Sequence, residues 1–412
     1  MDKNTIVGLD IGTNAVRIVM GQKNQDGKLQ IIGAAETKSE GITRGSISSI
    51  EDTVSSISET IEKCERMTGI HIDKMVVGVN GTNLKTVNSK GVVAVAKANT
   101  QVDESDIFRA IELAETTSTL PNYEVIHTLP TAYHLDDQKD IKDPVGMSGV
   151  RLEVDTQVIM ALTSHIKNLN KCIYRTGVDI EDIVFSILAT AEAILTKKQK
   201  ELGVGVINIG EATTSLAVFE DGDILHTAVL PIGAGHVTND LAIGLKTSVD
   251  TAEAVKIDHA QAISDGISKR KEVDLHKYSD EEKKGSYVYK KDIAEIASAR
   301  MEEIFKMVNE ELIKIDRNGK LPSGLVLTGG GSKLLMIIDL AKKVFSLPVF
   351  IGIPKEDFFT IDKLNDPEYT TALGLVIWGD NYIIDNKNFL ANFSAIKKTT
   401  EKMSHWFKNL LP

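Results

Sequence analysis

Cysteine is scarce in this chain, and long apolar runs are missing. Only Cys64 and Cys172 occur among the 412 residues, too few for a disulfide framework or a cysteine-rich metal site. No run of about eighteen apolar residues is present, so no segment is expected to span a membrane. The amino terminus lacks the charged and then apolar pattern of a signal peptide. These absences predict a cytoplasmic protein.

An excess of positive charge is also missing. The formal net charge is -11, with 47 Lys and Arg against 58 Asp and Glu, so no nucleic-acid partner is expected. The chain is 42% hydrophobic and 25% charged, which is ordinary for a globular protein. Its length allows several domains and a large buried core.

The two halves of the chain carry the same order of predicted elements. A strand, a tight turn and a second strand are expected at 5–20 and again at 204–219. Each unit continues with another strand and then a helix, expected at 28–36 and 49–68 in the first half and at 223–231 and 236–245 in the second. The repetition predicts two related α/β domains that face each other.

Two segments interrupt this repeat. Residues 82–162 contain a predicted helix at 104–117 that Asp103 caps, and they read as an inserted α+β subdomain. Residues 247–316 are charged and mainly helical, with a polar loop at 279–286. The first core subdomain is expected at 1–81 and 163–203, and the second at 204–246. Residues 317–380 are expected to complete the second core and return to the first. A linker is expected at 381–399 and a terminal helix at 400–412.

Three glycine-containing turns follow predicted strands. In the first, Asp10 precedes Gly12, Thr13 and Asn14; such a turn exposes backbone N–H groups to a phosphate, and the carboxylate suits Mg²⁺ held through water. An ordinary hairpin turn is an equally good interpretation of this segment alone.

The second and third turns extend the pattern. Gly210, Thr213 and Thr214 follow Asn208 at the matching place in the second half. Gly329 to Ser332 link a strand to a helix predicted at 333–344, where glycine lets backbone approach a base or a phosphate. Loop flexibility alone also explains a glycine run. All three turns in this order are less expected by chance than any one of them.

The ordered turns resemble the superfamily of actin, sugar kinases and heat-shock chaperones. The resemblance implies ATP and Mg²⁺ between the halves, and residues 251–256 look like the element that reaches ribose and adenine in bacterial actins. A surface ion pair of Glu253 with Lys256 is the alternative. The implied nucleotide-binding residues are Asp10, Gly12, Thr13, Asn14, Asn208, Gly210, Thr213, Thr214, Gly235, Glu253, Lys256, Gly329, Gly330, Gly331 and Ser332.

The first insertion narrows the resemblance further. Residues 126–130, Tyr133, Asp136 and 141–153 are similar to the signature of the bacterial cell-division family FtsA, as are 201–204 ahead of the second turn. The expected fold is α/β: an actin-like two-domain ATPase core with an FtsA-type inserted subdomain and a C-terminal amphipathic helix.

The second turn departs from the family pattern. Asn208 replaces an Asp, Glu211 and Ala212 replace glycines, and Ser215 replaces an acidic residue. Loss of the carboxylate at 208 removes a charge that would place Mg²⁺ or polarise water. We therefore expect ATP binding with weak or absent hydrolysis.

The end of the chain has the pattern of an interfacial helix. From Lys387 onward there are five Lys and one Glu, a net charge of +4. One helical face is apolar and flanked by basic side chains. A terminal helix docked on the protein itself is the alternative. The expected membrane-binding residues are Lys402, Met403, Trp406, Phe407, Lys408, Leu410 and Leu411.

The family resemblance implies a function. It implies a peripheral protein on the cytoplasmic side of the membrane at the septum, which tethers FtsZ filaments, polymerises with itself and recruits later divisome proteins. Arg300, in a helix predicted at 292–312, would pair with a carboxylate of the FtsZ C-terminal peptide; pairing within the helix to Glu295 or Glu303 is the alternative. A PilM-like pilus-assembly adaptor and a small-molecule kinase of the same superfamily are the other functions that this fold permits.

Overall fold

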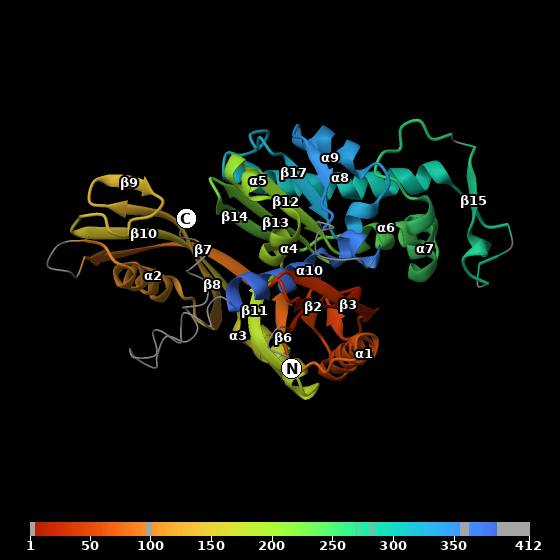
Figure 1. Ribbon diagram of the computed structural model, residues 1–412. Helices are drawn as coiled ribbons and strands as arrows, with labels where there is room; N and C mark the ends of the chain where they lie inside the picture. Colours follow the sequence, from red (N-terminus) through yellow and green to blue (C-terminus); the bar gives the residue numbers. More distant parts are fainter. Residues whose placement is uncertain are drawn as a thin grey trace.

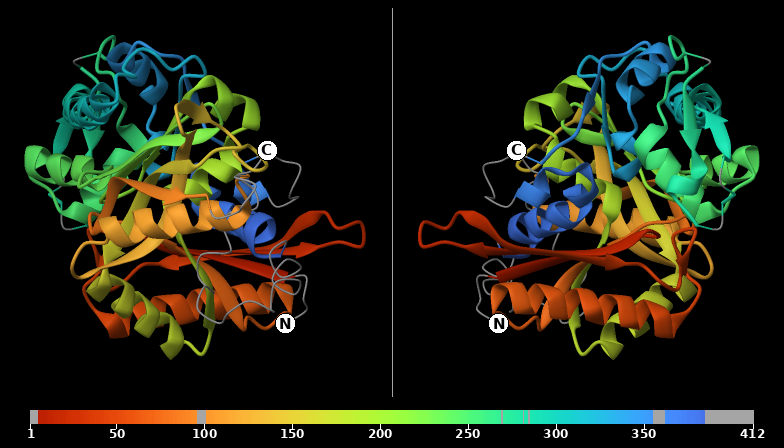
Figure 2. Two further views of the ribbon diagram at one scale, coloured as in Figure 1. Left: turned by 90° about the vertical axis from the view of Figure 1, so that its left-hand side faces the viewer. Right: turned by 90° about the vertical axis from the view of Figure 1, so that its right-hand side faces the viewer.

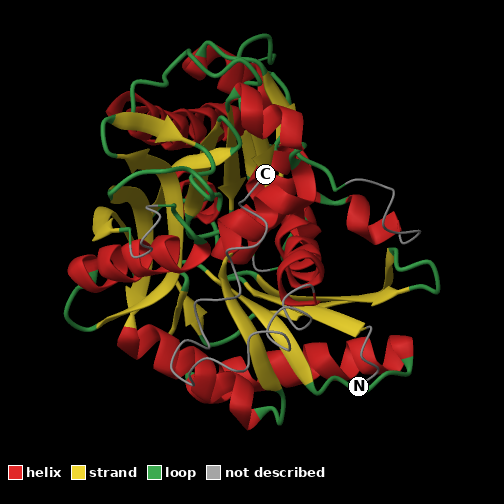
Figure 3. Cartoon of the chain, turned by 60° about the vertical axis from the view of Figure 1, so that its left-hand side comes forward, coloured by secondary structure: helices red, strands yellow, loops and turns green. Residues whose placement is uncertain are grey.

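The computed structural model describes residues 5–95, 101–268, 270–280, 282–283, 285–354 and 362–384. Two five-stranded sheets form the body of the molecule, and helices cover their outer faces (Figure 3). A four-stranded sheet forms the first insertion at one end, and the second insertion lies at the opposite end (Figure 1). The α/β fold class is confirmed.

The first sheet has the strand order β11-β6-β1-β2-β3. Helix α1 follows it, with Ser49 as its N-cap and Gly69, at φ 71°, as its C-cap. The β2–β3 hairpin extends past the rest of the body (Figure 2). The elements are β1 (Thr5–Ile11), β2 (Ala15–Lys23), β3 (Leu29–Lys38), β4 (Ile42–Thr43), β5 (Ser46–Ile47), α1 (Ile50–Thr68), β6 (Lys74–Val79), α3 (Thr163–Arg175), β11 (Asp179–Phe185), α4 (Ser186–Ile194) and α5 (Lys197–Leu202).

The second sheet repeats the first. Its strand order is β14-β13-β12-β17-β18. The antiparallel strands β13 and β14 lie on one side of β12, and the parallel strands β17 and β18 lie on the other. In the first sheet, β2 and β3 lie on one side of β1 and β6 and β11 on the other in the same way. The predicted internal repeat is therefore present. Its elements are β12 (Val204–Ile209), β13 (Thr214–Glu220), β14 (Asp223–Leu230), α6 (Gly235–Leu245), β17 (Leu325–Thr328), η2 (Gly330–Lys333), α9 (Ile337–Phe345) and β18 (Val349–Ile351).

The helix predicted to start at Lys333 starts later. Gly330–Lys333 is a 3₁₀ turn, and Met336 then adopts a left-handed conformation at φ 61° before α9 begins. The chain afterwards returns to the first half through η4 (Asp362–Asn365), η5 (Pro367–Tyr369), α10 (Thr370–Trp378) and the π-helical turn η6 (Gly379–Ile384).

Helix α10 packs closely on α4 of the first half, and α4 also contacts β12 and β13 of the second half. A Cβ on Gly374 would lie 2.0 Å from the carbonyl oxygen of Ala189, so only glycine fits this crossing. Residues of both halves meet there in one buried cluster with Trp378.

The first insertion is a sheet of order β7-β10-β8-β9 with α2 packed on one face. Asp103 caps α2 in a capping box with Asp106, as the sequence predicts. The insertion leaves and re-enters the core at one place, where the Leu162 N–H donates to the Asn83 carbonyl at 3.2 Å. Its elements are β7 (Leu84–Ala94), α2 (Glu104–Ser118), β8 (Tyr123–Leu135), β9 (Gln138–Ile141) and β10 (Arg151–Leu162).

The second insertion packs α7 and the long helix α8 against α6. A short hairpin and a 3₁₀ turn connect α7 to α8. The elements are α7 (Val249–His259), β15 (Glu272–Asp274), η1 (Leu275–Lys277), β16 (Tyr287–Tyr289) and α8 (Lys290–Lys314). Among the described residues, no helix is both long and apolar enough to cross a bilayer.

Candidate functional site

A small hairpin links the first two glycine turns. Arg44 and Gly45, at φ 53° and 73°, form the turn between β4 and β5, where positive φ matches the twist of a two-residue hairpin. The Gly45 N–H donates to Thr13 Oγ1 at 3.3 Å. A Cβ on Gly45 would lie 3.1 Å from Gly81 Cα and 3.7 Å from Thr213 Cγ2. Thr13 and Thr213, one from each half, therefore flank the same glycine.

A hydrogen bond also crosses between the halves here. Ser215 Oγ donates to Asn80 Oδ1 at 3.0 Å. Ser215 stands where the family pattern has an acidic residue, so the departure noted in the sequence supplies this contact. Neither Gly45 nor Asn80 was predicted as a site residue, because neither lies in a glycine motif.

The second and third turns pack directly on each other. Gly329 has φ 79°, and a Cβ on it would lie 2.2 Å from Asn208 Oδ1, so glycine is required for both conformation and space. A Cβ on Gly331 would lie 2.3 Å from Ile209 Cγ2. The Gly235 N–H donates to the Glu211 carbonyl at 2.8 Å. Predicted residues from three separate segments thus form one structural unit.

Asp10 lies near the end of β1, next to the first turn. Burial raises the pKa of its carboxyl to about 6, and the charge of Arg17 partly offsets this shift. A divalent cation would favour the ionised carboxylate further. The Gly12 N–H closes the adjacent turn by donating to the Ala15 carbonyl at 3.1 Å.

Glu211 adds a second carboxylate near the second turn. Burial raises its pKa, the negative charge of Glu253 raises it further, and Lys256 and Lys38 act in the opposite direction. Lys38 belongs to the first half and Glu253 to the second insertion, so Glu211 feels charges from both sides. An anionic phosphate beside it would need a cation or a proton to offset this charge.

Glu253 and Lys256 contact each other on α7. Lys256 Nζ lies 2.6 Å from Glu253 Oε2 and donates to Thr238 Oγ1 at 2.8 Å. Thr238 also donates to Glu253. The ion pair that the sequence offered as an alternative is present, and a role with ribose or adenine stays a prediction.

A charge network joins the third turn to the first half. Lys333 Nζ lies 2.6 Å from Asp366 Oδ2 and 3.3 Å from Glu368 Oε1. Glu368 in turn pairs with Arg17, whose Nε lies 3.2 Å from Glu36 Oε2. Sequence reasoning missed this network, because Arg17 and Glu368 are far apart along the chain.

Arg300 is already paired. Its Nε and Nη2 donate to the two carboxylate oxygens of Asp240 at 2.6 and 2.9 Å, and its Nη1 donates to Glu303 at 2.6 Å. The Glu303 pair is the alternative that the sequence offered, whereas Asp240 was not anticipated. The predicted membrane-binding residues lie outside the described residues: Lys402, Met403, Trp406, Phe407, Lys408, Leu410 and Leu411.

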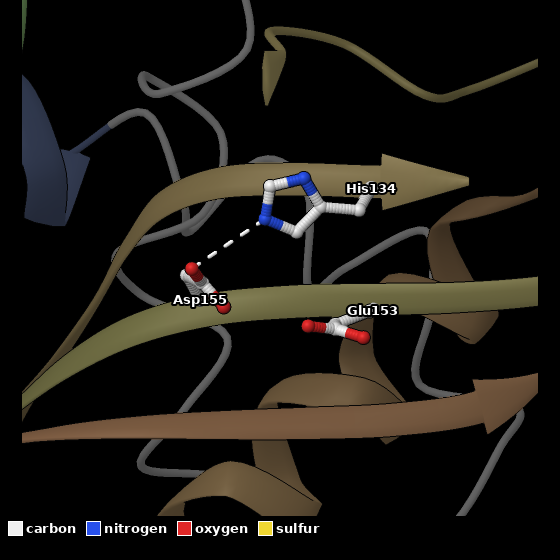
Figure 4. A group of neighbouring side chains, drawn as sticks. All are labelled: His134, Glu153 and Asp155. Carbon is white, nitrogen blue, oxygen red and sulfur yellow. Dashed lines mark ion pairs between the residues drawn. The ribbon is translucent and has the colours of Figure 1, made fainter. Parts of the chain in front are cut away.

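A group of possible metal ligands lies on the first insertion (Figure 4). His134 Nε2 lies 3.4 Å from Asp155 Oδ2, and Glu153 is close by. His134 Nδ1 accepts the Asp140 N–H at 3.2 Å, which places the imidazole proton on Nε2, toward Asp155. Lys90 Nζ lies 3.0 Å from Asp155 and 3.3 Å from Glu153. Lys90 supplies the positive charge here, so the group forms a salt-bridge network.

The fold defines the class of protein. Two α/β domains of equal topology, with glycine turns facing between them, are the arrangement of actin-like proteins. Among solved structures, the chain resembles the PilM–PilN type IV pilus biogenesis complex, with a TM-score of 0.67, 16% identity, and 91% of this chain and 98% of that chain covered. It also resembles MreB5 of Spiroplasma citri bound to ADP, with a TM-score of 0.52, 14% identity, and 96% and 99% covered.

Sequence comparison identifies the family. The family model "Cell division protein FtsA" matches residues 205–374, and "SHS2 domain inserted in FTSA" matches residues 81–160. The cell division protein FtsA of Pseudomonas aeruginosa is 36% identical, over 91% of this chain and 89% of that protein. The FtsA of Bacillus subtilis is 35% identical, over 91% and 84%. The chain belongs to the FtsA family of cell division proteins.

This result decides among the functions considered. The predicted family and the actin-like fold are both confirmed. The PilM likeness, at 16% identity, shows a shared fold alone, and the match to the FtsA insertion favours a cell-division role over pilus assembly or a small-molecule kinase.

Proposed function

We propose that this protein is an ATP-binding adaptor that holds FtsZ filaments at the cytoplasmic membrane at the division site. The observation that carries the nucleotide part is the meeting of the three turns: Gly45 lies between Thr13 and Thr213, and Gly329 packs on Asn208. Family membership supports the cell-division part. A structural relative, MreB5, was solved with ADP, which supports a nucleotide in this fold.

The residues present fit ATP with Mg²⁺ in most respects. Asp10, whose pKa burial raises to about 6, would hold the metal through water, and the metal would supply charge neutralisation for the phosphates. Thr13, Thr213 and the turn amides would bind phosphate oxygens, and Gly330 at the third turn would lie against the nucleoside. Glu211 is an unfavourable group, since its carboxylate repels phosphate unless Mg²⁺ lies between them.

Equilibrium titration of the full chain with fluorescent ATP tests this site. We expect saturable binding that needs Mg²⁺ and is lost in Asp10→Asn and Gly329→Val. Val at 329 would clash with Asn208, so circular dichroism must show that this variant is folded. Absence of a saturable site in the wild-type chain would refute the nucleotide proposal.

The adaptor role needs two further contacts. An acidic C-terminal peptide of FtsZ would dock at Arg300, and the basic apolar tail from about residue 400 would bind anionic lipid. Self-assembly would place many tails on one filament, and later divisome proteins would bind the assembled form. Sedimentation of full-length and tail-deleted protein with anionic liposomes, with and without ATP, tests the membrane contact; equal sedimentation of both forms would refute it.

A further inference from the structure

We infer that Asp240 is an internal competitor for the peptide site: it occupies Arg300 in the free protein, and an acidic peptide must displace it. The inference rests on the peptide docking proposed above and adds the residue that sets its affinity. It concerns a feature that the sequence did not predict, an ion pair between two residues that lie 60 positions apart in the chain, on different helices.

The contact has the geometry that a bound peptide carboxylate would need. The guanidinium of Arg300, on α8, offers Nε and Nη2 to the two oxygens of Asp240, on α6, at 2.6 and 2.9 Å. Such a two-point contact is the preferred way for Arg to bind a carboxylate. A second carboxylate cannot use the same two N–H groups at the same time. Asp240 and a peptide carboxylate therefore compete for one edge of Arg300.

The pair is open enough to exchange. The side chains of Arg300 and Asp240 are 25% and 28% exposed, so Asp240 regains water when it is released. Helix packing fixes both backbones, because Gly244 on α6 lies against Ile296 on α8, where a Cβ would be 2.6 Å from Ile296 Cδ1. Release of Asp240 thus requires a side-chain rotation and no movement of the helices.

Exchange has a consequence for salt dependence. When the peptide binds the wild type, the ion pair between Arg300 and the peptide replaces the one between Arg300 and Asp240. The bound peptide therefore gains little net electrostatic free energy. Affinity must then come mainly from apolar contacts, and Ile243 is 77% exposed one turn after Asp240 on the same helix. Without Asp240, the peptide would form a net new ion pair, and its binding would become stronger and more sensitive to salt.

The test is fluorescence anisotropy with a synthetic C-terminal peptide of FtsZ from the same organism, titrated with full-length protein over a series of salt concentrations. Asp240→Asn should bind about two- to fivefold more tightly at low salt, the scale of one partly exposed ion pair, and its affinity should fall more steeply with salt. Asp240→Ala should behave in the same way, which would show that the effect does not depend on the Asn side-chain amide of the first variant.

The matched control is Glu220→Gln. Glu220 accepts from Nε and Nη2 of Arg317 at 3.1 and 2.6 Å, with side-chain exposures of 27% and 29%. This variant removes the same charge from a similar pair elsewhere in the second half, so it should leave peptide affinity and its salt dependence unchanged. An equal gain in Glu220→Gln would overturn the inference, because net charge alone would then explain the effect.

Arg300→Ala separates this inference from the proposed docking. If Arg300→Ala weakens binding while Asp240→Asn binds equally or more weakly than wild type, docking stands, but Asp240 positions Arg300 and does not compete for it. If Arg300→Ala leaves binding unchanged, the docking assignment itself fails and the inference fails with it.

Discussion

Asp182, on β11, is a half-buried acid whose pKa depends on its surroundings. Its Oδ2 accepts from the Trp378 indole N–H at 3.3 Å and its Oδ1 from the Ile183 N–H at 2.9 Å. Burial nevertheless raises the pKa of Asp182 from 3.8 to about 6. The folded protein therefore binds this proton more tightly than the unfolded chain, and its free energy of unfolding falls as pH rises from about 4 through 6.

Asp182→Asn should remove this loss. Asn does not titrate, but its single oxygen can accept from only one of the two N–H groups, that of Trp378 or that of Ile183. The stability of the variant relative to wild type should therefore start at or below zero near pH 4 and rise by up to about 2–3 kcal/mol as the pH increases above 7. Urea unfolding at several pH values measures the difference. The exposed Asp179 on the same strand is the control, because Asp179→Asn removes the same charge from a position that is not buried. A constant gain at every pH would contradict the argument from burial.

Asn208 leads to a prediction about rate. Its Nδ2 donates to Thr371 Oγ1 at 3.2 Å, and an Asp of the same size would accept from that hydroxyl. We expect the wild type to hydrolyse ATP well below the roughly 1–100 s⁻¹ of kinases, and Asn208→Asp to be equal or faster because it restores a carboxylate. Steady-state phosphate release measures this.

The added variant Asp10→Asn is the control for that prediction. In the Asn208→Asp background it should abolish any gain, since the metal would no longer be held. Wild-type turnover at ordinary kinase rates would contradict the role given to Asn208.

At the scale of elements, local patterns were predicted well and distant contacts were not. The starts of α1 and α2 could be predicted because Ser49 and Asp103 cap them and apolar spacing follows. The start of α9 could not, because a left-handed Met336 interrupts the expected helix. The three glycine turns were visible in the sequence. Their contact through Gly45 was not, because folding alone brings that hairpin beside Thr213.

The tail carries the prediction about membrane binding. A helix of about twelve residues is marginal in water, so it should fold on the lipid surface. Trp406→Glu with Phe407→Glu should abolish liposome binding at any salt, because each apolar side chain contributes up to about 1.5–3 kcal/mol on burial. Lys402→Gln with Lys408→Gln should weaken binding mainly on anionic lipid, and less at high salt.

Liposome sedimentation measures both pairs of variants. Neutral vesicles are the matched control for the Lys variants, since those should then behave like wild type. Wild-type sedimentation of the Trp406 and Phe407 double variant would show that the tail is not the membrane anchor.

At the scale of the whole molecule, the first insertion touches both halves. It meets the first half where the Phe185 N–H donates to His127 Nε2 at 3.0 Å. It meets β14 of the second half through Thr86 and Thr227, whose hydroxyls are 2.8 Å apart, and through Lys142, whose Nζ lies 2.5 Å from Asp223 Oδ2. These two sets of contacts hold the insertion to both halves.

Thr86→Val with Lys142→Gln should loosen the second set. The buried Thr227 hydroxyl would lose its partner, at a cost of about 1–3 kcal/mol, while the exposed Lys142 pair contributes less than about 1 kcal/mol. Hydrogen exchange should become faster along β14, with little change at β11. Lys90→Gln, which breaks pairs within the insertion, is the control. Unchanged exchange along β14 would show that these contacts do not hold the insertion to the second half.

The two chain ends of the first insertion adjoin at Asn83 and Leu162, and this has an evolutionary consequence. Because one hydrogen bond of 3.2 Å spans the two ends, a tight turn would suffice to close the chain after the whole insertion is deleted. The core strands on either side would keep their order and direction. An insertion with adjoining ends can be gained, lost or exchanged between genes without a change in the order of the core strands.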